Sequence, residues 1–124
     1  MNEQNYNHMI DMLIKATQLK LISWEEDASR NAFVTKIHDC KIKIKSVYDI
    51  GIEESSVLLS LSNPDNVVFS TYSFSEETDK AEYDKLSLLY SVIRDVVYRI
   101  SESEGMILEG LRKILDESND GLPF

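Results

Sequence analysis

The spacing of apolar residues changes twice along this 124-residue chain, and that change limits the folds open to it. Between residues 4 and 18 apolar side chains recur at intervals of three and four. Between 32 and 74 they alternate with polar ones, and from about 78 the longer interval returns. The first spacing follows the turn of an α-helix and the second follows the two faces of a β-strand. The sequence therefore predicts a single α+β domain, residues 1–124, with an N-terminal helix, a four- to five-stranded antiparallel meander sheet and two C-terminal helices.

The strongest strand signal is the alternation in "CKIKIK", residues 40–45. Burying Ile42 and Ile44 is favourable by roughly 1.5–3 kcal/mol each, whereas burying unpaired lysines is costly. Lys41, Lys43 and Lys45 should therefore point away from the core, and a slip of one residue would exchange the two faces.

A two-residue turn at His38 and Asp39 should join this strand to the one before it, with Ile37 opposite Cys40. One face of the pair then carries the isoleucines, Phe33 and Cys40. We call the other face the lysine face, and it consists of Val34, Lys36, Lys41, Lys43 and Lys45.

Two further strands should flank the turn "NPDN", residues 63–66, where proline suits the second turn position. The first should face inward with Val57, Leu59 and Leu61. The second should divide into two faces, one with Val68, Ser70, Tyr72 and Phe74 and the other with Val67, Phe69 and Thr71. The segment "KLISW", residues 20–24, is the candidate for a fifth strand, and the polar "EEDASRN" after it should be a loop.

The helix expected from about Thr78 is apolar over more than one face. Leu88 and Val92 widen a stripe that is already complete, so a second subunit should cover this helix and the protein should be a homo-oligomer, at least a dimer. Ser101 and Glu104 fit a capping box that would start a new helix, and a continuous helix is the alternative. The last helix should be amphipathic and should stop at "NDGLPF", with apolar positions Ile107, Leu108, Leu111, Ile114 and Leu115.

Several function classes lack support in the sequence. The net charge of −9 argues against binding duplex DNA. One cysteine, no apolar run of membrane length and no secretory leader predict a cytoplasmic protein without a membrane span. Neither phosphate-binding glycine loop nor a GxSxG motif is present, and the two histidines and one cysteine do not complete a zinc site. We therefore expect no catalytic residues, no metal and no cofactor, and a protein that is not an enzyme.

Arginines and aromatic residues gather near the last strand and the long helix. Arg94 and Tyr98 are four residues apart and should share a helix face. Arginine presents a planar fork to phosphate, and an aromatic ring presents a stacking surface to a base. Each of these residues taken singly is more often a core aromatic or a surface ion pair. The candidate ligand-binding residues are Phe69, Tyr72, Phe74, Tyr90, Arg94 and Arg99.

Two stretches carry a resemblance: "LKLISWEED" leading into "NAFVTKIHDCKIKIK", and "YDKLSLLYSVIRD" leading into the final helix. Their layout resembles small phage and prophage proteins, and in size and order it is similar to the anti-Thoeris family, which sequesters the cyclic ADP-ribose signal of TIR-domain defence enzymes. The resemblance implies a non-catalytic sponge that holds this nucleotide between two protomers. It also implies that Phe69, Tyr72 or Phe74 stacks on the base and that Arg94 or Arg99 contacts the pyrophosphate.

A second function class remains open because toxin-immunity proteins and other small modules share this layout. In this alternative the protein is an interaction module that binds a basic protein partner through its acidic surface.

Overall fold

The computed structural model describes residues 1–29 and 31–118. Its elements follow in the order α1 Glu3–Gln18, β1 Glu25–Glu26, β2 Ala32–Ile37, β3 Cys40–Asp49, β4 Glu54–Ser62, β5 Val68–Ser75, α2 Lys80–Tyr98 and α3 Ile100–Glu117. All five strands form one antiparallel sheet in the order β1-β2-β3-β4-β5. The predicted α+β meander with one N-terminal and two C-terminal helices is confirmed.

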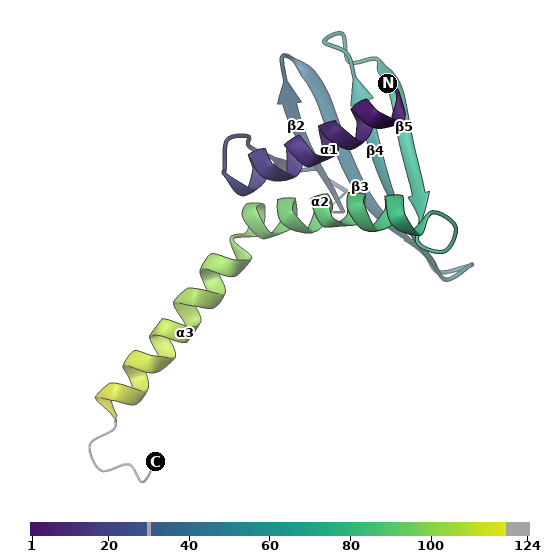
Figure 1. The fold of residues 1–124 in the computed structure, drawn as a ribbon. Coiled ribbons are helices and arrows are strands. Elements are labelled where there is room, and N and C mark those ends of the chain that lie inside the picture. Colours follow the sequence, from purple (N-terminus) through teal and green to yellow (C-terminus); the bar gives the residue numbers. More distant parts are fainter. Residues whose placement is uncertain (30, 119–124) are drawn as a thin grey trace.

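Helices α1 and α2 lie side by side on one face of the sheet, and α3 leaves this body (Figure 1). The core fills the space between the two helices and the sheet, where Phe33, Ile44 and Leu59 meet Ile10, Leu86 and Leu89, all at 0% exposure. The opposite face of the sheet is not covered by any described element (Figure 1). That uncovered face is the lysine face.

The hairpin between β2 and β3 has the predicted register. Ile37 pairs with Cys40, and both turn residues, His38 and Asp39, have positive φ angles of 50° and 63°. Two successive positive φ values match the right-handed twist of the flanking strands, which is why a two-residue turn of this kind fixes the register. Ile42 and Ile44 are buried as predicted, at 7% and 0% exposure, whereas Ile37 at the end of the hairpin is 36% exposed.

The fifth strand is not the one predicted. Residues 20–24 form no strand, and β1 consists of Glu25 and Glu26 in the segment expected to be a loop. Trp24 instead points into the core, where its Nε1–H donates to Thr17 Oγ1 at 3.0 Å. Thr35 Oγ1 donates to the Ser23 carbonyl at 2.7 Å. These two bonds hold the chain just before β1 against the helix and the sheet.

A β-bulge in the last strand pair changes one predicted face. Ser62 pairs with Val68, but Leu61 pairs with Ser70, so Phe69 is the extra residue. Ser70, Tyr72 and Phe74 share the inward face as predicted. Val68 does not: it lies on the far side of the bulge and is 57% exposed.

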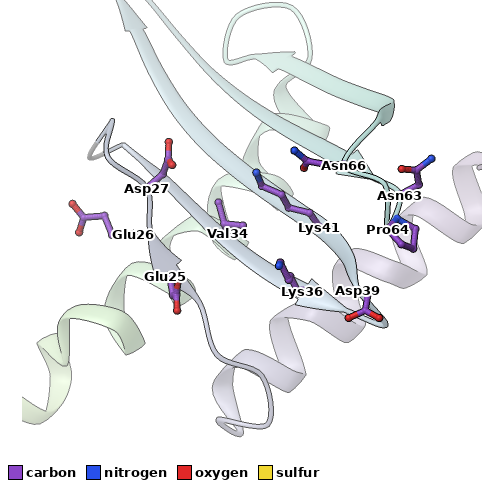
Figure 2. Close-up of a pocket in the computed structure, with 10 residues that line it drawn as sticks. All are labelled: Glu25, Glu26, Asp27, Val34, Lys36, Asp39, Lys41, Asn63, Pro64 and Asn66. Carbon is purple, nitrogen blue, oxygen red and sulfur yellow. The ribbon is translucent and has the colours of Figure 1, made fainter.

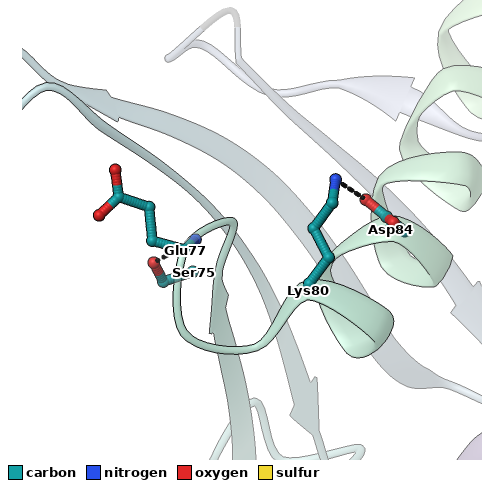
Figure 3. Close-up of polar contacts among 4 residues, drawn as sticks. All are labelled: Ser75, Glu77, Lys80 and Asp84. Carbon is teal, nitrogen blue, oxygen red and sulfur yellow. Dashed lines mark hydrogen bonds and ion pairs between the residues drawn. The ribbon is translucent and has the colours of Figure 1, made fainter.

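A short turn connects β5 to α2 (Figure 3). In it, the Glu77 N–H donates to Ser75 Oγ at 3.3 Å, and Lys80 forms an ion pair with Asp84 one helical turn later. Asp79 occupies the N-cap position but makes no side-chain capping bond. Its Oδ2 accepts from the Ser75 N–H instead, so it closes the turn rather than the helix.

Helices α2 and α3 are separate, and the break lies at Arg99, where φ is 54° and ψ is 42°. The predicted capping box does not form, because Asp95 Oδ1 accepts from both the N–H and the Oγ of Ser101, at 3.0 and 2.8 Å. Arg99 adds a two-bond ion pair with Glu102. The predicted stop at "NDGLPF" lies outside the described residues.

Candidate functional site

The lysine face carries an open cleft of about 430 Å³ (Figure 2). It spans one end of the sheet, from β1 across β2 and β3 to the turn between β4 and β5. Its lining combines carboxylates, lysines and turn residues: Glu25, Glu26, Asp27, Val34, Lys36, Asp39, Lys41, Asn63, Pro64 and Asn66.

Backbone pairing fixes the acidic wall of the cleft. Glu25 pairs with Val34 across the β1–β2 ladder, and the Asp27 N–H donates to the Ala32 carbonyl at 2.8 Å. The acidic segment is therefore part of the sheet edge. Glu25, which pairs with Val34, lies on the same face as the lysines, whereas Glu26, which pairs with the buried Phe33, points away from the cleft (Figure 2).

The far wall is the predicted "NPDN" turn. Asn63 Oδ1 accepts from the N–H groups of Asp65 and Val67, each at 3.0 Å. This side-chain bonding to the backbone is typical of asparagine at the start of a turn. Asn66 has a positive φ of 65°, a conformation that asparagine tolerates. The turn is thus held in one shape at the rim.

The charges of the cleft favour a cationic ligand. Four carboxylates, from Glu25, Glu26, Asp27 and Asp39, line it together with only two lysines. The Glu26 carboxylate accepts from the Tyr98 hydroxyl on the helix side of the sheet, so three carboxylates face two lysines. At its edge Lys43 Nζ lies 3.3 Å from Asp27 Oδ2. Hydrogen bonds from Lys43 and then from Ser29 lower the pKa of Asp27. The lysine face is therefore offset by the acidic edge of β1 and is not a free anion site.

The six candidate ligand-binding residues do not form one site within the chain. Tyr72 and Phe74 pack against Tyr6, with ring centroids 4.4 and 6.1 Å apart. Tyr90 packs on Phe33 at 5.4 Å. The other three are exposed at three further positions: Phe69 at the bulge, Arg94 on the surface of α2 and Arg99 at the α2–α3 junction.

The rings of Tyr6, Tyr72 and Phe74 border a hollow of about 410 Å³ near the start of α1. Glu3 and Glu82 line the same hollow, and both carboxylates disfavour a phosphate there. Burial raises the pKa of Tyr6 to about 12, with smaller contributions from Tyr72 and Glu82.

Two other candidates, Tyr90 and Arg94, belong to a second cluster, which is centred on Tyr98. The Arg94 guanidinium carbon lies 5.7 Å from the centre of the Tyr98 ring. The Tyr98 hydroxyl donates to Glu26, and that bond is the main cause of the raised pKa of Tyr98. Burial raises the pKa of Tyr90, and the charge of Arg94 opposes this rise. The cluster offers one exposed cation on a ring, with a carboxylate at its edge.

Sequence reasoning did not identify the acidic wall of the cleft. Residues 25–27 read as a polar loop because a two-residue strand has no apolar alternation to show. The one available signal was their position between a buried tryptophan and a strand.

The part of the chain that the structure describes holds neither a metal-binding group nor a membrane-spanning helix. Among residues 1–29 and 31–118, no three His, Cys, Asp or Glu side chains come close enough to hold a metal ion. None of the described helices combines the length and apolarity needed to cross a bilayer. Comparisons of the chain with protein-family models, with curated proteins and with solved structures find no match.

Proposed function

We propose that the protein is a non-catalytic interaction module that takes a basic segment of a partner protein into the cleft on the uncovered face of the sheet. The observation that carries this proposal is the excess of carboxylates over lysines in the cleft lining. A phosphorylated ligand would meet repulsion there, whereas a lysine or arginine side chain would meet the carboxylates of Glu25 and Asp27 on one side and that of Asp39 on another. The two lysines across the cleft then set the register by rejecting a cation placed on the wrong side.

The shape of the cleft also suits a polypeptide. It is open along the sheet surface, and Val34 and Pro64 supply apolar contacts between the charged walls. Because its charges are near the surface, the attraction should weaken as salt screens it over about 8–10 Å at physiological ionic strength.

The test is an NMR titration of the ¹⁵N-labelled protein with a peptide of alternating lysine and serine at low salt. Amide shifts should be confined to the cleft walls, including Val34, Lys36 and Asn63. The double variant Glu25→Gln/Asp39→Asn should weaken binding, because it removes one carboxylate from the acidic wall and one from the β2–β3 turn. Glu109→Gln removes a carboxylate on α3, far from the cleft, and should bind like the unmodified protein.

Two outcomes would contradict the proposal. One is the absence of shifts in the cleft at low salt. The other is equal shifts with a matched peptide of alternating glutamate and serine, because an acidic wall cannot attract both.

Sequestration of a cyclic ADP-ribose-type nucleotide is the second candidate, and the Arg94–Tyr98 cluster is the observation that favours it. A guanidinium beside an exposed ring can pair with a phosphate while the ring stacks on a base. In this candidate two protomers meet at the site, and the nucleotide is recovered unchanged.

Calorimetry with cyclic ADP-ribose isomers and adenine nucleotides tests this second candidate. Arg94→Ala should abolish binding, whereas Arg112→Ala, which removes an arginine on α3, should not. A hydrolysed product after heating of the complex would show an enzyme, and no heat with any of these nucleotides would remove the candidate.

A further inference from the structure

Helix α3 exposes an apolar stripe that no other described part of its own chain covers. The stripe consists of Ile107, Leu108, Leu111, Ile114 and Leu115, which are 51–63% exposed. The main contact of α3 is with α2, at the junction, and from there the helix projects away from the body (Figure 1). No side chain of α3 is buried. A helix this amphipathic normally lays its stripe on another surface.

An apolar groove on the body matches the stripe. It has a volume of about 200 Å³ and lies along the outer side of α1, lined by Met12, Lys15, Ala16, Leu19 and Leu21. Three of its apolar residues, Met12, Leu19 and Leu21, are 53–73% exposed. One chain therefore carries both an unpartnered helix stripe and an unpartnered groove.

Charge favours the groove, rather than a second α3 helix, as the surface that covers the α3 stripe. Helix α3 holds five acidic and two basic residues, a formal charge of −3. Two α3 helices would repel each other, and a parallel pair would also bring Glu104, which follows the stripe spacing, against its own copy. The groove instead offers Lys15 on its wall and Lys20 just beyond, and neither forms an ion pair with another described residue.

The apolar area that each arrangement can bury also favours the groove over a second α3 stripe. The five stripe residues expose roughly 150–350 Å² of apolar surface, taking about 60–120 Å² for a whole aliphatic side chain. A stable interface buries about 800 Å² per partner, so pairing of stripe with stripe falls well short. If each chain inserts its α3 into its partner's groove and also receives the partner's α3, two such contacts form. The apolar area buried per chain is then about twice that of one stripe, and the flanking side chains add to it.

We propose that two copies of this chain form a symmetric dimer in which α3 of each copy lies in the α1 groove of the other. The Arg99 junction supports this arrangement, because its positive φ and the Asp95–Ser101 bonds hold α3 away from its own body. This inference uses a surface separate from the cleft and does not depend on the proposed function.

The test is the mass of the full chain by light scattering at micromolar concentration, first unmodified and then with one surface altered. Leu111→Glu places a carboxylate in the centre of the stripe, and Met12→Glu places one in the groove, where it faces an acidic helix. Each should raise the dimer dissociation constant roughly 10- to 100-fold, as loss of a central contact does. Met106→Glu is the matched control, because Met106 is 62% exposed on α3 but lies about 140° around the helix from Leu111.

Mixing the two variants tests whether α3 of one chain occupies the groove of the other. The Met12→Glu chain keeps an intact α3, and the Leu111→Glu chain keeps an intact groove, so the mixture should regain a dimer with one of its two contacts. Circular dichroism checks that each variant remains folded.

Three results would overturn the proposal. A monomeric unmodified protein would show that α3 has no self-partner. A dimer that survives Met12→Glu would show that the groove is not the occupied surface. A mixture in which no dimer returns would show that the exchange does not occur.

Discussion

Thr17 is the residue whose replacement tests most directly how the body is assembled. It lies on α1 at 0% exposure, donates to the Leu13 carbonyl at 2.6 Å and accepts from Trp24 Nε1 at 3.0 Å. Valine has nearly the same shape but no hydroxyl. Thr17→Val therefore leaves the indole N–H of a tryptophan that is only 7% exposed without an acceptor.

The expected cost is about 1–3 kcal/mol, the penalty for a buried donor left unpaired. The Leu13 carbonyl adds little, since it sits in a helix where the backbone N–H four residues later is its regular partner. For a domain of this size each kcal/mol should lower the melting temperature by roughly 3–6 °C. Thr17→Ser is the control: it keeps both hydrogen bonds and loses one methyl group, worth about 1 kcal/mol.

Urea unfolding followed by fluorescence is the assay, because Trp24 is the only tryptophan and reports on this contact. Thr17→Val should lower the free energy of unfolding more than Thr17→Ser. Trp24→Phe combined with Thr17→Val should show coupling, because removing both partners leaves no orphaned donor. Its unfolding is followed by circular dichroism, since this variant lacks the tryptophan. If Thr17→Val is as stable as the unmodified protein, the indole bond does not hold the chain before β1, and the acidic wall of the cleft must be fixed in another way.

Three further predictions concern ionisation and the helix junction. Tyr6 should ionise at a pH of about 12 in a spectrophotometric titration; because this pKa lies above that of an unfolded tyrosine, its contribution to stability is complete below about pH 10 and is lost as the pH rises through 12. Asp95→Ala should destabilise the start of α3 by about 0.5–2 kcal/mol, the usual value of a cap, with faster amide exchange at Ser101 and unchanged exchange in the sheet. Lys43→Met should raise the pKa of Asp27 back toward its ordinary range in an NMR titration, and an unchanged pKa would show that this ion pair does not form in solution.

The fold was predictable where burial left one choice. In the β2–β3 hairpin Ile42 and Ile44 had to face inward, and a two-residue turn left a single register, so every partner could be named. The position of β1 could not be predicted, because its two glutamates are held by backbone pairing and by the anchoring of Trp24. The bulge at Phe69 could not be predicted either, because one unpaired residue leaves the alternation of apolar and polar residues on either side of it intact.

The site was less predictable than the fold because it depends on distances between elements. Sequence spacing placed Arg94 and Tyr98 on one helix face correctly, since both belong to α2. It could not show that Tyr72 packs against α1 while Tyr90 packs against β2. The exposure of the α3 stripe was also beyond reach, because an amphipathic pattern shows that a helix covers something without showing what.

The bulged strand β5 has a consequence for the handling of this protein. It is the last strand of the sheet, and its eight residues, "VFSTYSFS", contain no charged side chain and no proline. Natural sheets commonly protect an open edge with lysine, proline or very short strands, and the opposite edge has the protection of a two-residue strand made only of glutamates. On β5 the bulge alone interrupts the row of free backbone groups, and only at one end. Strand-to-strand aggregation of a destabilised chain should therefore begin between residues 70 and 75, and a lysine at the exposed Thr71 or Ser73 should suppress it without disturbing the core.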